Sequence, residues 1–466
     1  MYILSEKDYA EQSAFKSVNN FFHFFAVGKA LKRAGVYKTK GIQAMNIMLY
    51  LTFLVYSGKT MNRDATGKNP VIGNSKDAVY RLLRCQRVNW SSFLLAVSEK
   101  AIAFTEKLTS ETRKTAFVID DTLYERPFSK KTELIAKVYD HVDKRYTRGF
   151  RTLFLSWTDG ASLIPVCFRH LSSTDPKNRL VSEREGRDKR TCAVRAKREA
   201  VMKAPDVCLK LLAKAKHFGI HADYVLFDSW FAFPSVITKI KGMGYDVTAR
   251  VKNSAKVRYL YDGRALPLKV IYDRSKKRRG KSRYLLSVDI NLINDGEPGI
   301  PCRLVYVRNR GNRKDWIAIL TTDMDLTPED VLTLYGKRWS IEVFLKTCKT
   351  YLRFTGEFQQ VSYEAITAHT TIVALRYMIL SVEQRKRTDY RALGELFYDA
   401  TDEAAELTFH EVLMMIMASL TSALTRGSVA LDEDAARDFM AAFIGGLPPF
   451  VQRLLAPDLV ASQQPI

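Results

Sequence analysis

The spacing of apolar residues changes near residue 114 and separates two kinds of predicted structure. Up to about residue 113, the segments FKSVNNFFHFFAVGKALKRAG and SKDAVYRLLRCQRVNWSSFLLAVSEKAIAFTEKL repeat apolar residues at helical spacing. The first segment ends in a glycine, which is a common helix stop. We therefore expect residues 1–113 to form a helical N-terminal region.

After Lys114 the apolar residues fall into short runs that are typical of β-strands. TAFVID ends in Asp120 and Asp121, RTLFLSWTDGASLIPVCFRHLS predicts two strands joined by an Asp-Gly turn, and YVLFD ends in Asp228. Three segments between or after these strands have helical spacing: LVSEREGRDKRTCAVRAKREAVMKA, DVCLKLLAKAKHFG and PSVITKIKGMG. With DVTARVK as a further strand, residues 114–250 follow the order of a ribonuclease H-like α/β fold, although other mixed α/β folds share much of it.

A turn-rich stretch interrupts this pattern at residues 251–320. Its short runs KVRYLYDG, LPLKVIYD, RYLLSVDINLI, CRLVYVRN and WIAILTTD predict an inserted antiparallel β subdomain. The segment RSKKRRGKSR between the second and third runs is predicted as a hairpin tip. This tip contains four consecutive cations: Lys276, Lys277, Arg278 and Arg279.

Residues 321–385 return to the α/β core and contain the segment LTPEDVLTLYGKRWSIEVFLKTCKTYL. Thr327 is the predicted N-cap of a helix, and Pro328 occupies its first position. At about 100° per residue, a continuous helix would place four polar residues within an arc of about 60°. These are Tyr335, Arg338, Glu342 and Lys349. The spacing alone is equally consistent with an ordinary exposed ion pair between Arg338 and Glu342.

Composition and charge point to a polyanionic partner. The 466 residues exceed the usual size of a single domain and, at 47% hydrophobic, can bury sizeable cores. The net charge of +23 favours nucleic acid over a merely basic soluble protein. Residues 251–316 alone carry 17 Lys or Arg against 6 Asp or Glu. Residues 386–466 are acidic and apolar, and we expect a helical C-terminal region that serves as core or as a dimer surface.

Other features narrow the class of protein. The longest apolar run, residues 44–56, is too short to cross a bilayer, so we expect a buried helix and no membrane partner. The six cysteines lack a CxxC pair, and the first residues lack the order of a secretory signal, which together favour a cytoplasmic protein. In the N-terminal region, four cations at 76, 81, 84 and 87 fit either a DNA-reading helix or a solvated basic face.

The acids suggest a chemistry. Asp228 and one of the neighbouring pair Asp120 and Asp121 end buried strands, while Glu342 lies on a predicted helix. Three such carboxylates can hold two divalent cations, roughly 3.5–4 Å apart, for in-line attack on a phosphodiester. Mg²⁺ or Mn²⁺ requires oxygen ligands of this type. Arg338 would then hold a phosphate beside the metals.

These motifs resemble the bacterial insertion-sequence transposases of the DDE superfamily, in the "insertion sequence four" group that includes the transposon-five-like enzymes. The signature Y-(2)-R-(3)-E-(6)-K of that group is matched by Tyr335, Arg338, Glu342 and Lys349. VIDDT at 118–122 and LFDSWF at 226–231 are similar to the motifs of its first and second acids.

The resemblance implies roles for individual residues. Asp228 and Glu342 would be catalytic metal ligands, and the D-x-[ST] form favours Asp120 over Asp121 as the first acid, an assignment that stays open. Trp316, in KDWIAILTT, would stack on a base turned out near the cleaved end, with an ordinary core tryptophan as the alternative. Tyr335, Arg338 and Lys349 would grip backbone phosphate.

The resemblance also implies that the helical N-terminal region, residues 1–113, binds DNA. It further implies a reaction and partners. Metal-dependent hydrolysis would nick the end of the element, and the freed 3′ hydroxyl would then attack target DNA. Double-stranded DNA, both terminal inverted repeats and target, would be the partner, and two subunits would pair the two ends as a homodimer. A nuclease without strand transfer and an inactive DNA-binding relic are the alternatives. The sequence leaves open whether a DNA hairpin forms as an intermediate.

Overall fold

The fold is seen in a computed structural model that describes residues 13–386 with short gaps. The gaps are residues 38–40, 57, 59, 66–75, 111, 142, 185–187, 279–281, 295–296, 310–314 and 357–358, and a few positions between 435 and 442 are also described. The predicted C-terminal region at 386–466 therefore lies almost wholly outside the described residues.

The described part of residues 1–113 is helical, as the apolar spacing predicts. Its helices are α1 (Ser13–Phe24), α2 (Val27–Arg33), α3 (Ala44–Phe53), α4 (Met61–Ala65), α5 (Lys76–Leu83) and α6 (Trp90–Glu106). The side chain of Asn89 caps α6 by accepting a hydrogen bond from the Ser92 amide at 3.0 Å. The apolar run that begins at Ala44 forms the buried helix α3.

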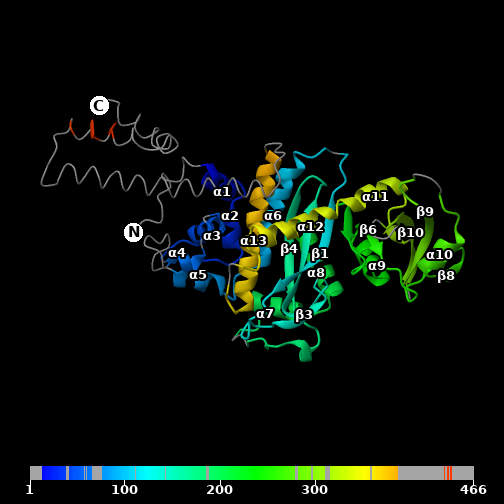
Figure 1. Cartoon of the computed structure of the whole chain (residues 1–466), viewed down its shortest axis with the longest axis horizontal. Coiled ribbons are helices and arrows are strands. Elements are labelled where there is room, and N and C mark those ends of the chain that lie inside the picture. The colour runs from blue at the N-terminus through cyan, green and yellow to red at the C-terminus, as the bar shows by residue number, and fades with distance from the viewer. Residues whose placement is uncertain are drawn as a thin grey trace.

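A long helix, α13 (Tyr363–Lys386), joins the helical region to the sheet. It lies beside α6 and crosses the middle of the molecule (Figure 1). Within the described residues it is the one helix long and apolar enough to cross a membrane, but its apolar window is wholly buried inside the protein. It therefore has the surroundings of a core helix.

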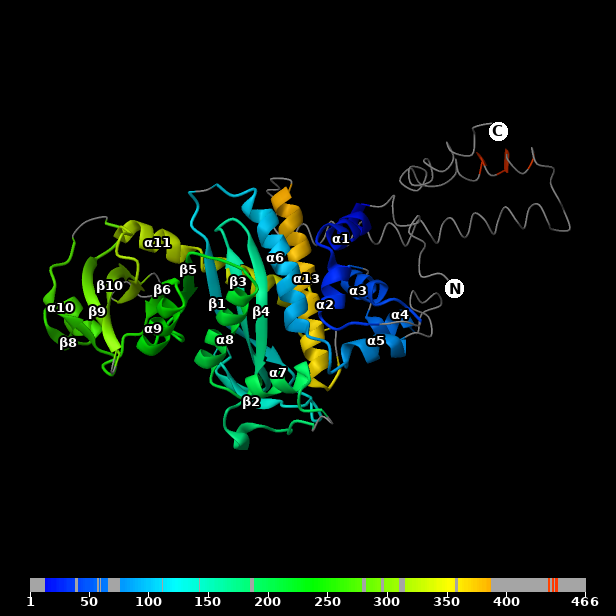
Figure 2. The same ribbon diagram turned by 180° about the vertical axis from the view of Figure 1, so that it is seen from behind.

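A mixed sheet forms the centre of the fold. Its core strands are β1 (Ala116–Glu125), β2 (Ala136–Asp140), β3 (Arg145–Thr158), β4 (Leu163–Leu171), β5 (Tyr224–Phe227) and β6 (Asp246–Val251). β1 pairs antiparallel with β3 and parallel with β5, and β5 pairs parallel with β6. β4 pairs with the other side of β3, and the edge strand β2 lies at one end of the sheet (Figure 2). The two predicted strands are thus confirmed, and they are neighbours in the sheet. The predicted end of the first strand is wrong, because β1 continues past Asp120 and Asp121 to Glu125 while it stays paired with β3.

Helices α7 (Cys192–Ala200), α8 (Ala204–His217) and α9 (Pro234–Gly242) connect these strands. The sequence predicts helix throughout 180–204, but α7 begins only after its cap residue, Thr191. The preceding segment is held differently, because the Arg184 amide donates to the buried carboxylate of Glu133 at 2.6 Å. The helical prediction was therefore wrong for the residues of this segment that the structure describes, 180–184 and 188–191.

The sheet continues through residues 251–320. β7 (Tyr259–Tyr261), β8 (Arg264–Leu266), β9 (Leu286–Asn294), β10 (Glu297–Arg308) and β11 (Trp316–Thr321) are antiparallel neighbours, and β11 pairs with β6. The predicted strand LPLKVIYD is instead helix α10 (Leu268–Arg274). Leu268 and Ile271, three residues apart, are both fully buried, so a helical turn satisfies this short apolar run.

The basic segment predicted as a hairpin tip is instead a connection between α10 and β9. Its described residues show no flanking strand pair, since α10 precedes the segment. The chain turns back where the Arg278 amide donates to the Leu285 carbonyl at 2.7 Å.

Candidate active site

The predicted Glu-bearing helix is two helices, α11 (Pro328–Gly336) and α12 (Trp339–Thr350). The predicted start is confirmed: Thr327 and Asp330 form a reciprocal capping box. The predicted continuity is wrong, because the amides of Lys337 and Arg338 bond carbonyls three residues back, at 3.1 and 3.0 Å. Such short-range bonds tighten the turn and change the helical phase, so the four polar residues do not share one straight face.

Lys337 anchors this break to the core. Its ammonium group donates to the carbonyl of Lys114, just before β1, and to the carbonyl of Asp159 at 3.2 Å. Gly160 next to Asp159 has a φ of 94°, and a Cβ there would lie 3.1 Å from the Lys337 side chain. Close packing against β1 and the β3–β4 turn thus fixes where α12 begins.

Arg338 brings two distant carboxylates together. Its Nη1 donates to Asp120 Oδ2 at 3.2 Å, and its Nη2 donates to Glu342 Oε1. The side chains of Arg338 and Asp120 are only 16% and 19% exposed, so water screens their ion pair weakly. The ion pair between Arg338 and Glu342 is therefore not an isolated surface pair, because the same guanidinium also binds Asp120.

Asp121 has different partners. Successive residues of a strand point to opposite faces, and the Asp121 carboxylate binds Arg151 on the neighbouring strand β3. Its amide donates to Asp120 Oδ1 at 2.8 Å. Of the two neighbouring acids, Asp120 alone is joined through Arg338 to Glu342.

Asp228 lies at the same level of the sheet as Asp120. It follows β5, and the parallel register pairs Val118 with Leu226 two residues before each acid. Burial raises the pKa of Asp120 to about 7; Arg338 opposes this rise, while the charges of Asp121 and Asp228 add to it. Asp228 is therefore close enough to Asp120 to act on it electrostatically.

Metal ligation needs a closer grouping of these acids than the structure shows. Among the residues that the structure describes, no three Asp, Glu, His or Cys side chains come together as a metal site. The Arg338 guanidinium lies between Asp120 and Glu342 and supplies the positive charge there. The donor atoms are nevertheless carboxylate oxygens, which is the ligand type that Mg²⁺ and Mn²⁺ prefer.

The other two residues of the predicted stripe separate. The ring of Tyr335 lies 5.8 Å from the Arg338 guanidinium, and burial raises its pKa, with Arg338 lowering it and Asp228 raising it. Burial lowers the pKa of Lys349, whose charged neighbours include Asp140, Arg151 and Asp121. Tyr335 thus belongs with Asp120 and Asp228, whereas Lys349 lies on the Asp121 side.

Trp316 packs inside the insertion. Its ring stacks on Tyr272 at a centroid distance of 5.1 Å and contacts the ring of the buried Tyr306 at a centroid distance of 4.9 Å.

The cations of the basic segment lie close to these rings. Lys277 lies 4.7 Å over the Tyr272 ring and Arg278 lies 4.6 Å over the Tyr284 ring, while Lys276 is exposed. Arg279 lies outside the described residues. Figure 1 places α10, which precedes this basic segment, on the side of the insertion away from α12.

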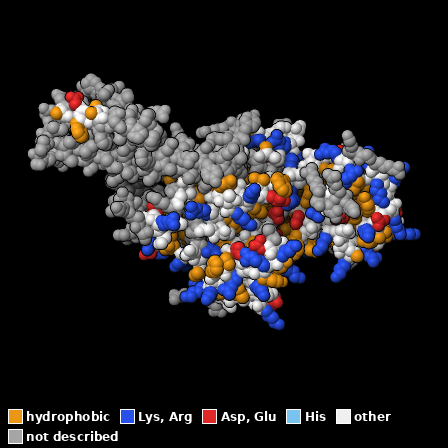
Figure 3. All heavy atoms as spheres, viewed as in Figure 1, with side chains coloured by type: hydrophobic (Ala, Val, Ile, Leu, Met, Phe, Trp, Pro, Cys, Tyr) orange, Lys and Arg blue, Asp and Glu red, His pale blue; other side chains and the backbone are white. Residues whose placement is uncertain are grey.

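The surface near the acids is of mixed charge. Asp and Glu gather near the middle of the molecule, with Lys and Arg on both sides of them (Figure 3).

Two residues near the acids were not identified as site residues from the sequence. Arg151 belongs to no motif, and Trp230, two residues after Asp228 in LFDSWF, is 53% exposed, which no sequence pattern reveals.

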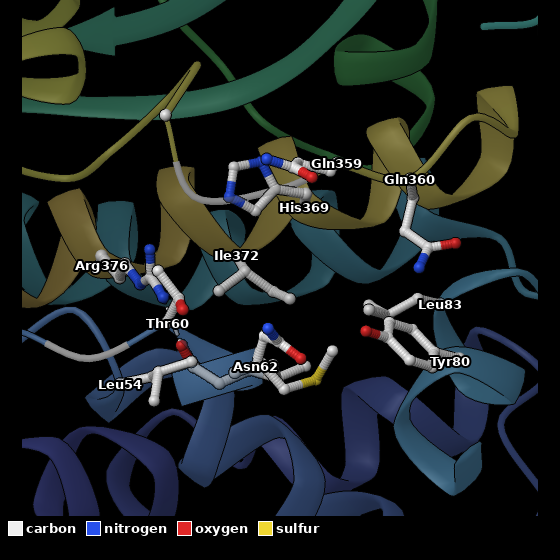
Figure 4. Close-up of a pocket in the computed structure, with 13 residues that line it drawn as sticks. Leu54, Thr60, Asn62, Tyr80, Leu83, Gln359, Gln360, His369, Ile372 and Arg376 are labelled. Carbon is white, nitrogen blue, oxygen red and sulfur yellow. Dashed lines mark hydrogen bonds between the residues drawn. The ribbon is translucent and has the colours of Figure 1, made fainter. Parts of the chain in front are cut away.

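A separate cavity of about 430 Å³ lies between α3–α5 and α13 (Figure 4). None of the predicted catalytic acids lines it. Tyr80 and Leu83 of α5 form part of its wall, and Arg84 reaches across to donate to Gln360 Oε1 at 2.6 Å. Arg84, which directly follows α5, is thus engaged within the protein.

Comparison with known proteins identifies the protein family to which the chain belongs. The family model described as "DDE superfamily endonuclease" matches residues 57–289, which is half of the chain. The matched range includes Asp120, Asp121 and Asp228, but it ends before Glu342. No curated protein matches the chain significantly. A solved structure described as "Drosophila P element transposase strand transfer complex" is 8% identical, covers 88% of this chain and 93% of that one, and has a TM-score of 0.23, too low to establish a shared fold.

Proposed function

Because the chain belongs to the DDE superfamily endonuclease family, we propose that it is a DNA transposase that cleaves at insertion-sequence ends and joins the freed strand to target DNA. Within that superfamily we propose the "insertion sequence four" group, on the strength of the Tyr-Arg-Glu-Lys signature at Tyr335, Arg338, Glu342 and Lys349. The proposed mechanism is cut-and-paste.

The single observation that carries this proposal is the bridge from Asp120 through Arg338 to Glu342. Asp120 and Arg338 are 218 residues apart, yet the fold places an acid of β1 and an acid of α12 on one guanidinium. Asp228 at the end of the adjacent strand raises the pKa of Asp120. We assign Asp120, Asp228 and Glu342 as the catalytic acids, with Asp121 holding Arg151.

The arrangement of strands supports a ribonuclease H-like core. The order β4-β3-β1-β5-β6, with only β3 antiparallel to its two neighbours, puts the acids of β1 and β5 on adjacent strands. The basic strands β7–β11 are the proposed insertion, and they extend the same sheet through β6 and β11.

The donor set fits a hard divalent cation. Asp120, Asp228 and Glu342 offer only oxygen ligands. The carboxylate of Asp120 already binds one cationic group, the guanidinium of Arg338, in a largely buried position. We propose that these three acids hold Mg²⁺ or Mn²⁺, two ions per site, once Arg338 moves from between them. Bound ions would stabilise charge on the attacking and leaving oxygens of an in-line displacement.

The remaining residues of the site would bind the DNA backbone. Arg338, released from the acids, has a planar fork of donors that suits phosphate, and Tyr335 lies beside it. In the first step water would attack the scissile phosphorus and the 3′ oxygen would leave. In the second step that 3′ hydroxyl would attack a target phosphodiester and release the target 3′ oxygen. The acids orient these groups.

The proposed partners follow from the reaction. The chain would bind duplex DNA at terminal inverted repeats and at the target, as a homodimer that pairs the two ends, in the bacterial cytoplasm. The net charge of +23 is consistent with binding a polyanion.

The test is an in vitro reaction with end-labelled terminal repeat DNA, taken from the sequence flanking the reading frame, and a target plasmid. We expect Mg²⁺-dependent nicking followed by a joined product. The variant Glu342→Gln should lose both products while binding the end within a few-fold; Glu329→Gln, at a half-buried glutamate of α11, is its matched control. Cleavage without any joined product would reduce the function to that of an endonuclease.

A further inference from the structure

A row of exposed aromatic side chains runs along the edge of the sheet to the candidate acids. Tyr146, Tyr139, His141 and Trp230 follow one another with ring centroids 5.1, 5.0 and 5.9 Å apart. Tyr146, Tyr139 and Trp230 are 63%, 37% and 53% exposed. We call these four residues the aromatic row. Large rings usually become buried, so an exposed set in mutual contact is a candidate binding surface.

Strand pairing and a tight turn hold the row in place. Tyr139 of β2 lies directly opposite Tyr146 of β3, so both rings project from one face of the ribbon. At the other end of the row, Trp230 follows Asp228, and its amide donates to Asp228 Oδ1 at 2.9 Å. His141, from the loop between β2 and β3, contacts Trp230 and so joins the two segments.

The row is connected to the acids at two points. Trp230 is tied to Asp228 through that hydrogen bond. Tyr139 is tied to Asp121 through Arg151, which donates to the Tyr139 carbonyl at 3.4 Å and to the Asp121 carboxylate. A ligand lying on these rings would therefore be adjacent to the proposed catalytic acids.

The charges around the row favour an anionic ligand. Lys137 lies 4.9 Å over the Tyr146 ring, and Arg148 is opposite Lys137 in the strand pair. Residues 136–149 contain four cations and two acids, and one of those acids, Asp143, pairs with Arg145 at 3.2 Å. Aromatic faces interspersed with cations are the combination that binds unpaired nucleotides, by stacking on bases and contacting phosphates.

From this placement we propose that the aromatic row binds unpaired DNA bases next to the scissile phosphate, with Trp230 as the innermost stacking residue. This rests on the proposed function, and it defines the substrate as DNA that is locally single-stranded at the site. A duplex keeps its bases paired and stacked, so the row would discriminate between opened and closed ends.

The test uses the full chain in EDTA, so that binding is measured without cleavage. The probes are a blunt duplex and the same duplex with a short single-stranded overhang that carries 2-aminopurine. We expect Trp230→Ala and Tyr139→Ala each to weaken overhang binding about tenfold and to relieve 2-aminopurine quenching, with blunt-duplex affinity unchanged within twofold. Trp230→Phe should restore most of the affinity. Tyr37→Ala, at an 81% exposed tyrosine of the N-terminal region, is the control.

Unchanged quenching in Trp230→Ala would overturn the proposal, as would an equal loss of overhang and blunt-duplex binding. If Trp316→Ala alone relieved quenching, the stacking surface would lie in the insertion instead, which also overturns it. None of these results touches the cleavage assay with Glu342→Gln, so failure of the aromatic row and failure of the proposed function are separable.

Discussion

Arg338 Nη1 lies 3.2 Å from Asp120 Oδ2, so a guanidinium occupies the space between two acids that we assign as metal ligands. The same guanidinium also binds Glu342. An arginine at this position neutralises the acids in the DNA-free chain, and it competes for them with a divalent cation. DNA phosphate, which suits the same fork of donors, offers Arg338 an alternative partner.

Removing this competitor should strengthen metal binding. We expect Arg338→Ala to bind Mn²⁺ about tenfold more tightly than the unaltered chain in the absence of DNA, because the carboxylates lose a neighbouring positive charge. Electron paramagnetic resonance of free Mn²⁺ measures this directly and does not depend on cleavage. Arg258→Ala, at an exposed arginine of the insertion, should leave Mn²⁺ affinity unchanged. Equal or weaker affinity in Arg338→Ala would mean that Arg338 does not compete with the metal.

The raised pKa of Asp120 predicts a pH-dependent stability in metal-free buffer. Burial is its main cause, and it favours the protonated acid in the folded state. The contribution of Asp120 to the free energy of unfolding is therefore fully present below about pH 4 and is lost as the pH rises towards 7. Relative to Asp120→Asn, the free energy of unfolding of the unaltered chain should fall by on the order of 2 kcal/mol between pH 5 and pH 8. Urea titrations in EDTA at both pH values measure it.

Asp159→Asn is the control for that experiment. Burial raises the pKa of Asp159, but hydrogen bonds from Ser162, Thr109 and Ala161 outweigh it and leave the pKa below its usual value. Stability from Asp159 is lost only as pH falls below about 4, so its variant should be destabilised equally at pH 5 and pH 8. A flat difference for Asp120→Asn would refute the raised pKa.

Lys197 should prove structural, although it lies in α7 among several other Lys and Arg residues. Its side chain is 1% exposed, and its ammonium group binds Glu133 at 2.6 Å and Glu364 at 2.7 Å. Lys197→Met leaves two buried carboxylates without their shared cation, which we expect to cost about 3–5 kcal/mol in the free energy of unfolding. Denaturant titration measures the loss. Lys189→Met, at an exposed lysine nearby, should change stability by less than about 0.5 kcal/mol.

The basic segment between α10 and β9 should contribute to the salt dependence of DNA binding. Replacing Lys276, Lys277, Arg278 and Arg279 with Gln should reduce the slope of log affinity against log salt by about 3.6 if all four contact phosphate. Fluorescence anisotropy from 50 to 200 mM salt measures the slope. Neutralising Lys210 and Lys216, exposed on α8, is the comparison, and we expect it to leave the slope unchanged. An unaltered slope in the quadruple variant would show that this segment faces solvent in the complex.

The sequence by itself determined the parts of the fold that depend on neighbouring residues. The cap at Thr327 and the presence of strands leading to Asp120 and Asp228 follow from spacing and local hydrogen bonding and were found as predicted, but β1 continues past the two acids to Glu125. The short run LPLKVIYD was assigned wrongly because eight residues with two buried apolar positions fit either a strand or a helix.

Only the tertiary structure decided how the site is assembled. The break before α12 depends on contacts of Lys337 with residues near positions 114 and 159, which no local pattern contains. Asp120 and Asp121 have nearly the same sequence context, but the alternation of a strand turns one towards Arg338 and the other towards Arg151. Exposure of Trp230 depends likewise on what the rest of the chain leaves uncovered. Spacing along the chain fixes local geometry, whereas pairing between distant residues is set by the packing of the sheet and its helices.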